Sequence, residues 1–248
     1  MIGRLLVALL VCHGAQAAGV VSLNLCTDQY LVRLAPERVA ALSPLARDPS
    51  LSVVATEAAG LPWVRADAEA VLKLAPDLVL AAEWGAQTTL QALERRGVRV
   101  VRSDLPEDFA AIRRETMRLA RLLRVEARGV ALLAAMDATL AGVVPGAKLA
   151  ATVLEPRGYT AGVGSLADSV LRAAGLRNAG SGRRQDLETL LAHPPALLVM
   201  ADAPAYPSLA TDFLSHPALA RLPTRRLPPA MLVCGGPWTA DAVRLLAP

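Results

Sequence analysis

The sequence predicts an α/β protein of two lobes, each built on a mainly parallel sheet, joined by a single long α-helix. Three observations predict this fold. Short apolar runs rich in β-branched residues alternate with helical patterns from Val20 onward, which is typical of βαβ units. The segment 107–140 has no proline, one glycine and apolar residues mostly at helical spacing. A glutamate–proline–strand element occurs once in each half of the chain.

The first lobe is predicted over residues 18–105. Apolar runs that end in loops or turn residues give its strands, and amphipathic stretches between them give its helices. The expected strands are 20–25, 39–43, 78–82 and 98–102, and the expected helices are 28–34, 67–75 and 87–96.

The connecting helix is predicted over residues 106–144, and the second lobe over 145–248. A continuous helix over 107–140 would be roughly 50 Å long, which suits a connector between lobes better than a crossover. Pro145 and Gly146 end it, and the alternation then resumes. In the second lobe the expected strands are 149–154, 197–201 and 231–234, and the expected helices are 166–174, 186–192, 209–214 and 239–246.

Residues 1–17 have the pattern of a cleaved signal peptide. Basic charge in 1–4 precedes an apolar run, 5–12, and the small-x-small site 15–17. The run is far shorter than the roughly 20 residues of a membrane span. A lipoprotein anchored at Cys12 is the alternative, but Val11 is not the small residue that such a site needs. We therefore expect a mature chain that begins near Ala18 and works in the periplasm.

Composition and motifs argue against several function classes. The formal net charge of +4 comes almost entirely from arginine, and no basic helix with interleaved aromatic residues suggests nucleic-acid binding. The chain has no phosphate-binding loop, and Gly162–Ser165 does not form a nucleophile elbow. Pairing of Cys26 with His193 or His216 as nucleophile and base is not supported by their spacing. We expect no catalytic residues and no enzyme activity.

The repeated element places Glu69 and Glu188 in matching positions. Each glutamate stands seven residues before a proline, Pro76 or Pro195, that opens an apolar strand. The match indicates that the two halves share one local structure, with a glutamate at the same point in both.

Several ordered motifs resemble the substrate-binding proteins of iron-siderophore, haem and cobalamin importers. They are the apolar run 20–25, the element at Glu69, the central helical segment and the turn Gly-Tyr-Thr-Ala-Gly-x-Gly-Ser-Leu at 158–166. The resemblance covers nearly the whole mature chain. It implies a ligand cleft between two lobes, a monomer, and an ABC permease dimer with its own ATPase as partner. It also implies that Glu69 and Glu188 meet arginines of that permease. A related sensor or scaffold would differ only in its partners.

The cleft is expected where loops follow the carboxyl ends of strands. The candidate ligand-binding residues by this criterion are Cys26, Arg47, Trp63, Trp84, Tyr159, Cys234 and Trp238. Trp63 and Trp84 fall where cobalamin-binding relatives place aromatic cleft residues, and aromatic faces suit a large planar ligand. Cobalamin is therefore the first choice of ligand. A ferric siderophore, met by Arg47, Arg102 or Arg157, comes next, and haem follows with Tyr159.

The two cysteines of the mature chain leave three alternatives open. They can form a disulfide between the lobes, remain as two buried thiols, or contact the ligand or its metal. A bare metal ion would need several converging histidine and carboxylate ligands. His193 and His216 each precede a proline and are expected to be structural. We expect no metal site or cofactor of the protein's own; a chelated metal would bring its own ligands.

Overall fold

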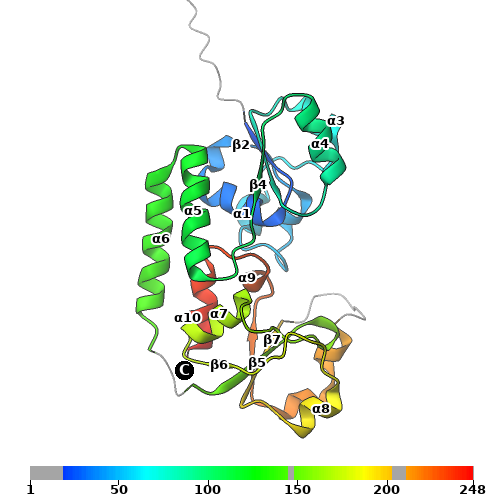
Figure 1. The fold of residues 1–248 in the computed structure, drawn as a ribbon, viewed down its shortest axis with the longest axis vertical. Coiled ribbons are helices and arrows are strands. Elements are labelled where there is room, and N and C mark those ends of the chain that lie inside the picture. The colour runs from blue at the N-terminus through cyan, green and yellow to red at the C-terminus, as the bar shows by residue number, and fades with distance from the viewer. Residues whose placement is uncertain (1–18, 145–147, 203–210, 248) are drawn as a thin grey trace, which may run out of the picture.

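The computed structural model describes residues 19–144, 148–202 and 211–247, and shows two α/β lobes, one above the other in Figure 1. Each lobe has a sheet of four parallel strands, in the order β2-β1-β3-β4 and β6-β5-β7-β8. The orders are equivalent, because in each lobe the first and third strands are central. The two-lobed parallel fold predicted from the sequence is confirmed. The predicted signal peptide, 1–17, lies outside the described residues.

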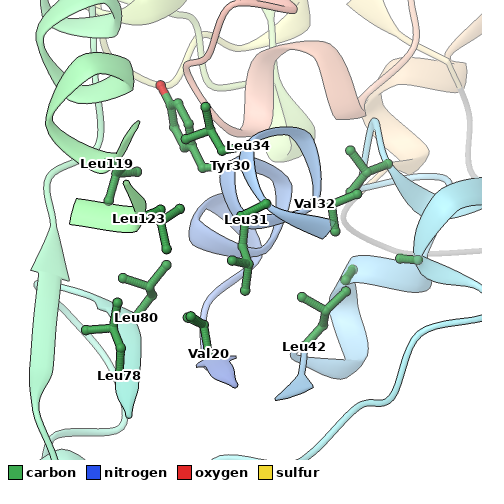
Figure 2. Packing of buried hydrophobic residues seen from close by; sticks show 14 of the residues in the cluster. Val20, Tyr30, Leu31, Val32, Leu34, Leu42, Leu78, Leu80, Leu119 and Leu123 are labelled. Carbon is green, nitrogen blue, oxygen red and sulfur yellow. The ribbon is translucent and has the colours of Figure 1, made fainter. Parts of the chain in front are cut away.

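The N-terminal lobe forms around a sheet whose central strands are buried on both faces. Every residue of β3 is buried, which explains why its sequence is apolar throughout instead of alternating. Figure 2 shows the packing on one face, where Leu31 of α1 points towards Val20 and Leu123 of α5 lies beside Leu80. The elements are β1 (Val20–Ser22), α1 (Leu25–Leu34), β2 (Val39–Ala41), α2 (Ala55–Ala58), α3 (Ala68–Lys73), β3 (Leu78–Ala82), α4 (Gln87–Arg95) and β4 (Val100–Ser103).

The connector differs from the single long helix expected, because the chain turns back at Arg124. Two helices, α5 (Phe109–Leu123) and α6 (Glu126–Ala141), lie side by side along both lobes (Figure 1). Arg124 has a left-handed φ of 60°, and the N–H of Val125 donates to the Ala120 carbonyl at 2.8 Å, a pattern that ends helices. Gly129 lets the pair approach, since a β-carbon there would lie 2.6 Å from that of Ala120.

The C-terminal lobe repeats the architecture, with one strand in a different place from the prediction and a short strand, β6, that was not predicted. The last strand is β8, and the segment expected as strand 231–234 is largely helix α9. Pro228 and Pro229 open that helix, while the two arginines of β8 hide its strand pattern. The expected helix 209–214 lies partly outside the described residues. The elements are β5 (Ala150–Leu154), α7 (Leu166–Ala173), β6 (Arg177–Asn178), α8 (Leu187–Ala192), β7 (Leu197–Ala201), β8 (Thr224–Leu227), α9 (Ala230–Val233) and α10 (Thr239–Leu246).

The two lobes are joined directly where α1 meets the segment after α9. Cys26 and Cys234 form a disulfide with Cα atoms 5.3 Å apart. The Tyr30 hydroxyl donates to the Gly235 carbonyl at 3.1 Å, and the Tyr30 and Trp238 rings pack with centroids 5.1 Å apart. Burial raises the pKa of Tyr30, so its phenol stays a neutral donor. Of the three alternatives for the cysteines, the structure has the disulfide.

Buried side chains of α1 also fix the loop that follows β2. The fully buried Asp28 carboxylate accepts hydrogen bonds from the backbone N–H and the hydroxyl of Ser43. Gln29 Oε1 accepts from the Val53 N–H at 2.9 Å. The loop 43–54 is therefore held near both of its ends by neighbouring residues of one helix.

Loss of the disulfide should destabilise the protein. The double variant Cys26→Ser with Cys234→Ser removes a cross-link between residues 208 apart in sequence. Such a loss lowers the free energy of unfolding by about 2–5 kcal/mol. Denaturant unfolding without reductant measures the change. Unreduced, denatured mature protein should also contain no titratable thiol, and finding two would contradict the cross-link.

The stability contributed by Asp28 should depend on pH. Burial raises the pKa of Asp28 from 3.8 to about 7. A carboxyl with a raised pKa in the folded state contributes most below its unfolded pKa, and this contribution is lost as the pH rises through the folded value. The free energy of unfolding should therefore fall, relative to Asp28→Asn, between pH 3.8 and about 7. The relative fall is a few kcal/mol, at about 1.4 kcal/mol per pKa unit.

Urea unfolding at several pH values measures this difference. The exposed Asp212, replaced by Asn in the same way, is the control. A wild-type-to-variant difference that stays constant over this range would show that Asp28 titrates alike in folded and unfolded chains.

Candidate ligand cleft between the lobes

The candidate site lies between the two lobes. A cavity of about 280 Å³ lies against the carboxyl ends of β5, β7 and β8 of the C-terminal lobe. Leu51, from the loop after β2, lines the same cavity from the N-terminal lobe. Open parallel sheets place ligand sites at this edge of their strands, so the cleft is the candidate site.

Trp63 is held at the surface of the N-terminal lobe by its neighbours. Its backbone forms an isolated parallel bridge with Leu42, one residue beyond β2. The side chain is 46% exposed, and the Arg47 guanidinium lies 6.0 Å from its ring centroid. Arg47 also donates to the carbonyls of Ala58 and Leu61. Arg47 therefore braces the segment that precedes Trp63 through two of its donors.

Trp84 projects from the loop between β3 and α4. Its side chain is 81% exposed, although tryptophan is usually largely buried. The loop turns sharply, because Gly85 and Ala86 both have positive φ, 90° and 52°. Ala86 directly precedes α4. A positive φ strains the backbone of a residue that has a β-carbon and is therefore uncommon outside glycine. The turn leaves the indole of Trp84 free in solvent beyond the end of β3.

Tyr159 occupies the corresponding edge of the C-terminal lobe. It follows β5 and is 48% exposed. Its carbonyl accepts from the Glu155 N–H at 2.7 Å, and its backbone bridges antiparallel to Arg184. Arg157 lies just before Tyr159 in the chain, and Arg184 lies across this bridge with Arg183 next to it. All three arginine side chains are exposed. The phenol is therefore at a basic, solvent-facing rim.

The remaining predicted cleft residues lie deeper. Cys26 and Cys234 are buried against Leu25, with Leu51 and Trp238 packed on them. Trp238 is half-buried, and its indole N–H donates to the Cys234 carbonyl at 3.0 Å. A disulfide has no thiolate to offer, so binding of a metal by either sulfur, one of the alternatives above, does not fit this structure. None of these three predicted residues lines the cavity; they belong to the buried junction between the lobes.

Glu69 and Glu188 are exposed in the first turns of α3 and α8. The aspartate that caps each helix is also equivalent: Asp67 accepts from the Ala70 N–H and Asp186 from the Thr189 N–H. Each helix leads into the third strand of its lobe, β3 or β7. Figure 1 shows α3 and α8 on the side of the molecule away from α6. The repeat found in the sequence is thus a structural repeat.

Among the described residues, no group of three histidine, cysteine, aspartate or glutamate side chains is placed to hold a metal ion. His216 is structural, since its Nδ1 accepts from the Ala218 N–H. Arg102 is paired with Glu94 at 2.7 Å, and this hydrogen bond lowers the pKa of Glu94. No helix in the described ranges is long and apolar enough to span a bilayer.

Sequence analysis missed Leu51 and Asp28. Leu51 is one of many leucines, and only the packing of the lobes brings it to the cavity. Asp28 had a weak signal, because a charged residue inside an apolar helix that buries nearly every side chain needs a partner.

Comparison with known proteins identifies the family. The periplasmic binding protein family matches residues 20–226, while no protein of curated function matches the sequence. Similar solved structures include a periplasmic haem-binding protein from Pseudomonas aeruginosa, with 26% identity, TM-score 0.71 and coverage of 92% of this chain and 91% of that one. The periplasmic haem-binding protein RhuT from Roseiflexus sp. RS-1 has 23% identity, TM-score 0.70 and coverage of 92% and 95%.

A third similar structure, assigned to an Fe³⁺-hydroxamate ABC transport system, comes from Saccharomonospora viridis. It has 20% identity, TM-score 0.66 and coverage of 93% of this chain and 92% of that one. These structures share the two-lobed fold along almost the full length of both chains. With the family match over most of the sequence, they lead to one conclusion: the chain belongs to the periplasmic binding protein family.

Proposed function

We propose that this protein is the periplasmic binding component of an ABC importer and captures a metal tetrapyrrole in the cleft between its lobes. The observation that carries the proposal is the exposure of Trp63, Trp84 and Tyr159 at the carboxyl edges of the two sheets. Large aromatic side chains left in water at a cleft offer flat contact area at small entropic cost. A planar macrocycle is the ligand that uses such faces best.

The absence of a metal-binding cluster among the described residues supports a chelate over a bare ion. A metal already held by a tetrapyrrole needs at most one or two further ligands from the protein. Haem-binding proteins among the similar structures support the same ligand class. A ferric hydroxamate is the alternative, supported by the Saccharomonospora structure and by the basic rim at Arg157, Arg183 and Arg184.

Cobalamin and haem make different demands on Tyr159. Cobalamin carries its own axial ligands and would use the aromatic walls, as inferred from Trp63 and Trp84. Haem iron would gain a phenolate ligand from Tyr159. Titration of mature protein with cobalamin, haem and a ferric hydroxamate, followed by tryptophan fluorescence and calorimetry, separates the three. If neither cobalamin nor haem binds saturably, the proposal is overturned.

The aromatic wall should contribute directly to affinity. Trp84→Ala should weaken tetrapyrrole binding about tenfold or more, since losing one stacked aromatic contact costs on the order of 1.4 kcal/mol or more. Trp84→Phe keeps an aromatic face and should lose no more than a few-fold. Calorimetry measures both. Equal affinity of wild type and the alanine variant would remove Trp84 from the site.

Glu69 and Glu188 are proposed to dock the loaded protein on the permease. Exposed charges at a rim set the rate and orientation of association more than the affinity for ligand. Glu69→Arg with Glu188→Arg should lower uptake in cells to below about a tenth, through like-charge repulsion of permease arginines, and leave ligand affinity unchanged. Glu126→Arg is the matched control, because Glu126 is also exposed in the first turn of a helix, α6. Loss of ligand affinity in the double variant would contradict docking.

A further inference from the structure

The cavity beneath Leu51 differs in character from the aromatic rim of the cleft. Its floor consists of buried apolar residues at the ends of three neighbouring strands, including Leu154, Met200 and Leu227. Leu232 and Val233 of α9 form a side wall. Glu155 is the single charged residue among those that line it, and its side chain is exposed. The cavity therefore favours uncharged, apolar groups, because burying a charge against such a floor is costly.

The size of the cavity decides what can enter. Pockets for complete drug-sized ligands measure roughly 300–1,000 Å³, and this cavity measures about 280 Å³. A tetrapyrrole is larger than most drugs and cannot be enclosed here. A single side arm, such as an alkyl chain or a small aromatic group, is of the right size.

Leu51 closes the cavity from the opposite lobe and is positioned by local hydrogen bonds and by packing on the disulfide. Its N–H donates to the Asp48 carbonyl at 3.0 Å, and Asp48 Oδ1 accepts from both the N–H and the hydroxyl of Ser50. The Leu51 side chain packs against the Cys26–Cys234 disulfide. Since Cys234 directly follows α9, the packing of Leu51 on this disulfide links the roof of the cavity to its side wall. The cavity is thus preformed, and its volume depends on the residue at position 51.

We propose that this cavity is a binding subsite for a neutral apolar group and that Leu51 sets the size of the group admitted. This part of the proposal rests on the proposed function. The group is an apolar arm at the edge of the chelate, and it inserts beneath Leu51 while the macrocycle lies on Trp63 and Trp84. The subsite discriminates between chelates with the same metal and ring that differ in their peripheral substituents.

The neutral fluorophore N-phenyl-1-naphthylamine tests the subsite without assuming the identity of the chelate. Mature wild-type protein should bind it saturably at one site. Leu51→Trp fills the cavity and should weaken binding at least tenfold. Leu45→Trp is the matched control, because Leu45 belongs to the same loop, is 48% exposed and does not line the cavity; it should bind the probe like wild type. Circular dichroism and melting temperature establish that both variants are folded.

Competition connects the subsite to the chelate. A tetrapyrrole that binds should displace the fluorophore, and Leu51→Trp should weaken that tetrapyrrole at least tenfold while Leu45→Trp does not. No saturable binding of the fluorophore, equal loss in both variants, or failure of a bound tetrapyrrole to displace it would each overturn the subsite. Fluorophore binding limited by Leu51, with no chelate bound, would instead overturn the proposed function and leave an apolar binding site with Leu51 as its limit.

Discussion

The junction between α1 and residues 234–238 is the constraint on which the cleft depends. Cys26 lies just beyond β1, and Cys234 directly follows α9, so their disulfide ties the carboxyl edge of one sheet to the wall of the other. The Tyr30–Gly235 hydrogen bond and the Tyr30–Trp238 ring contact reinforce the same point. All of these groups are at least half-buried, which protects the contacts from competition with water. The junction therefore limits how far the two lobes can move relative to each other.

The helix pair α5–α6 braces the lobes from a second side. Leu119 and Leu123 of α5 join the core of the N-terminal lobe, as Figure 2 shows, while Leu140 of α6 packs on the core of the C-terminal lobe. Two helices packed together resist bending more than one, and the disulfide opposes hinge opening across the cleft. A cleft held at two places is largely preformed, so binding loses little free energy to ordering the protein.

Elements that the local sequence determines could be predicted from the sequence, whereas elements that depend on contacts in the folded chain could not. Strands β3 and β7 match their predicted bounds. A five-residue apolar run that closely follows a proline is typical of a buried strand and of few other structures. The break at Arg124 was hidden, since arginine is a good helix former and a left-handed arginine has no sequence signature. The arginines of β8 hid its strand in the same way. Trp84 and Tyr159 were proposed because they follow strands, and Trp63 because it shortly precedes the element at Glu69; their role in binding stays a prediction. Leu51 reaches the cavity only when the lobes pack.

The equivalence of the lobes makes their differences at the cleft informative. The sheets have the same strand order, and the exposed glutamates stand at equivalent positions, as two similar contacts with a dimeric permease would require. The cleft walls are unlike. The N-terminal lobe exposes Trp63 and Trp84, while the C-terminal lobe has an apolar cavity and the basic rim around Tyr159. A ligand that matches all three surfaces can lie in only one orientation, because turning it over would place a charged edge against the apolar floor. On the proposed function, the symmetric part of the fold serves docking and the asymmetric part selects the ligand.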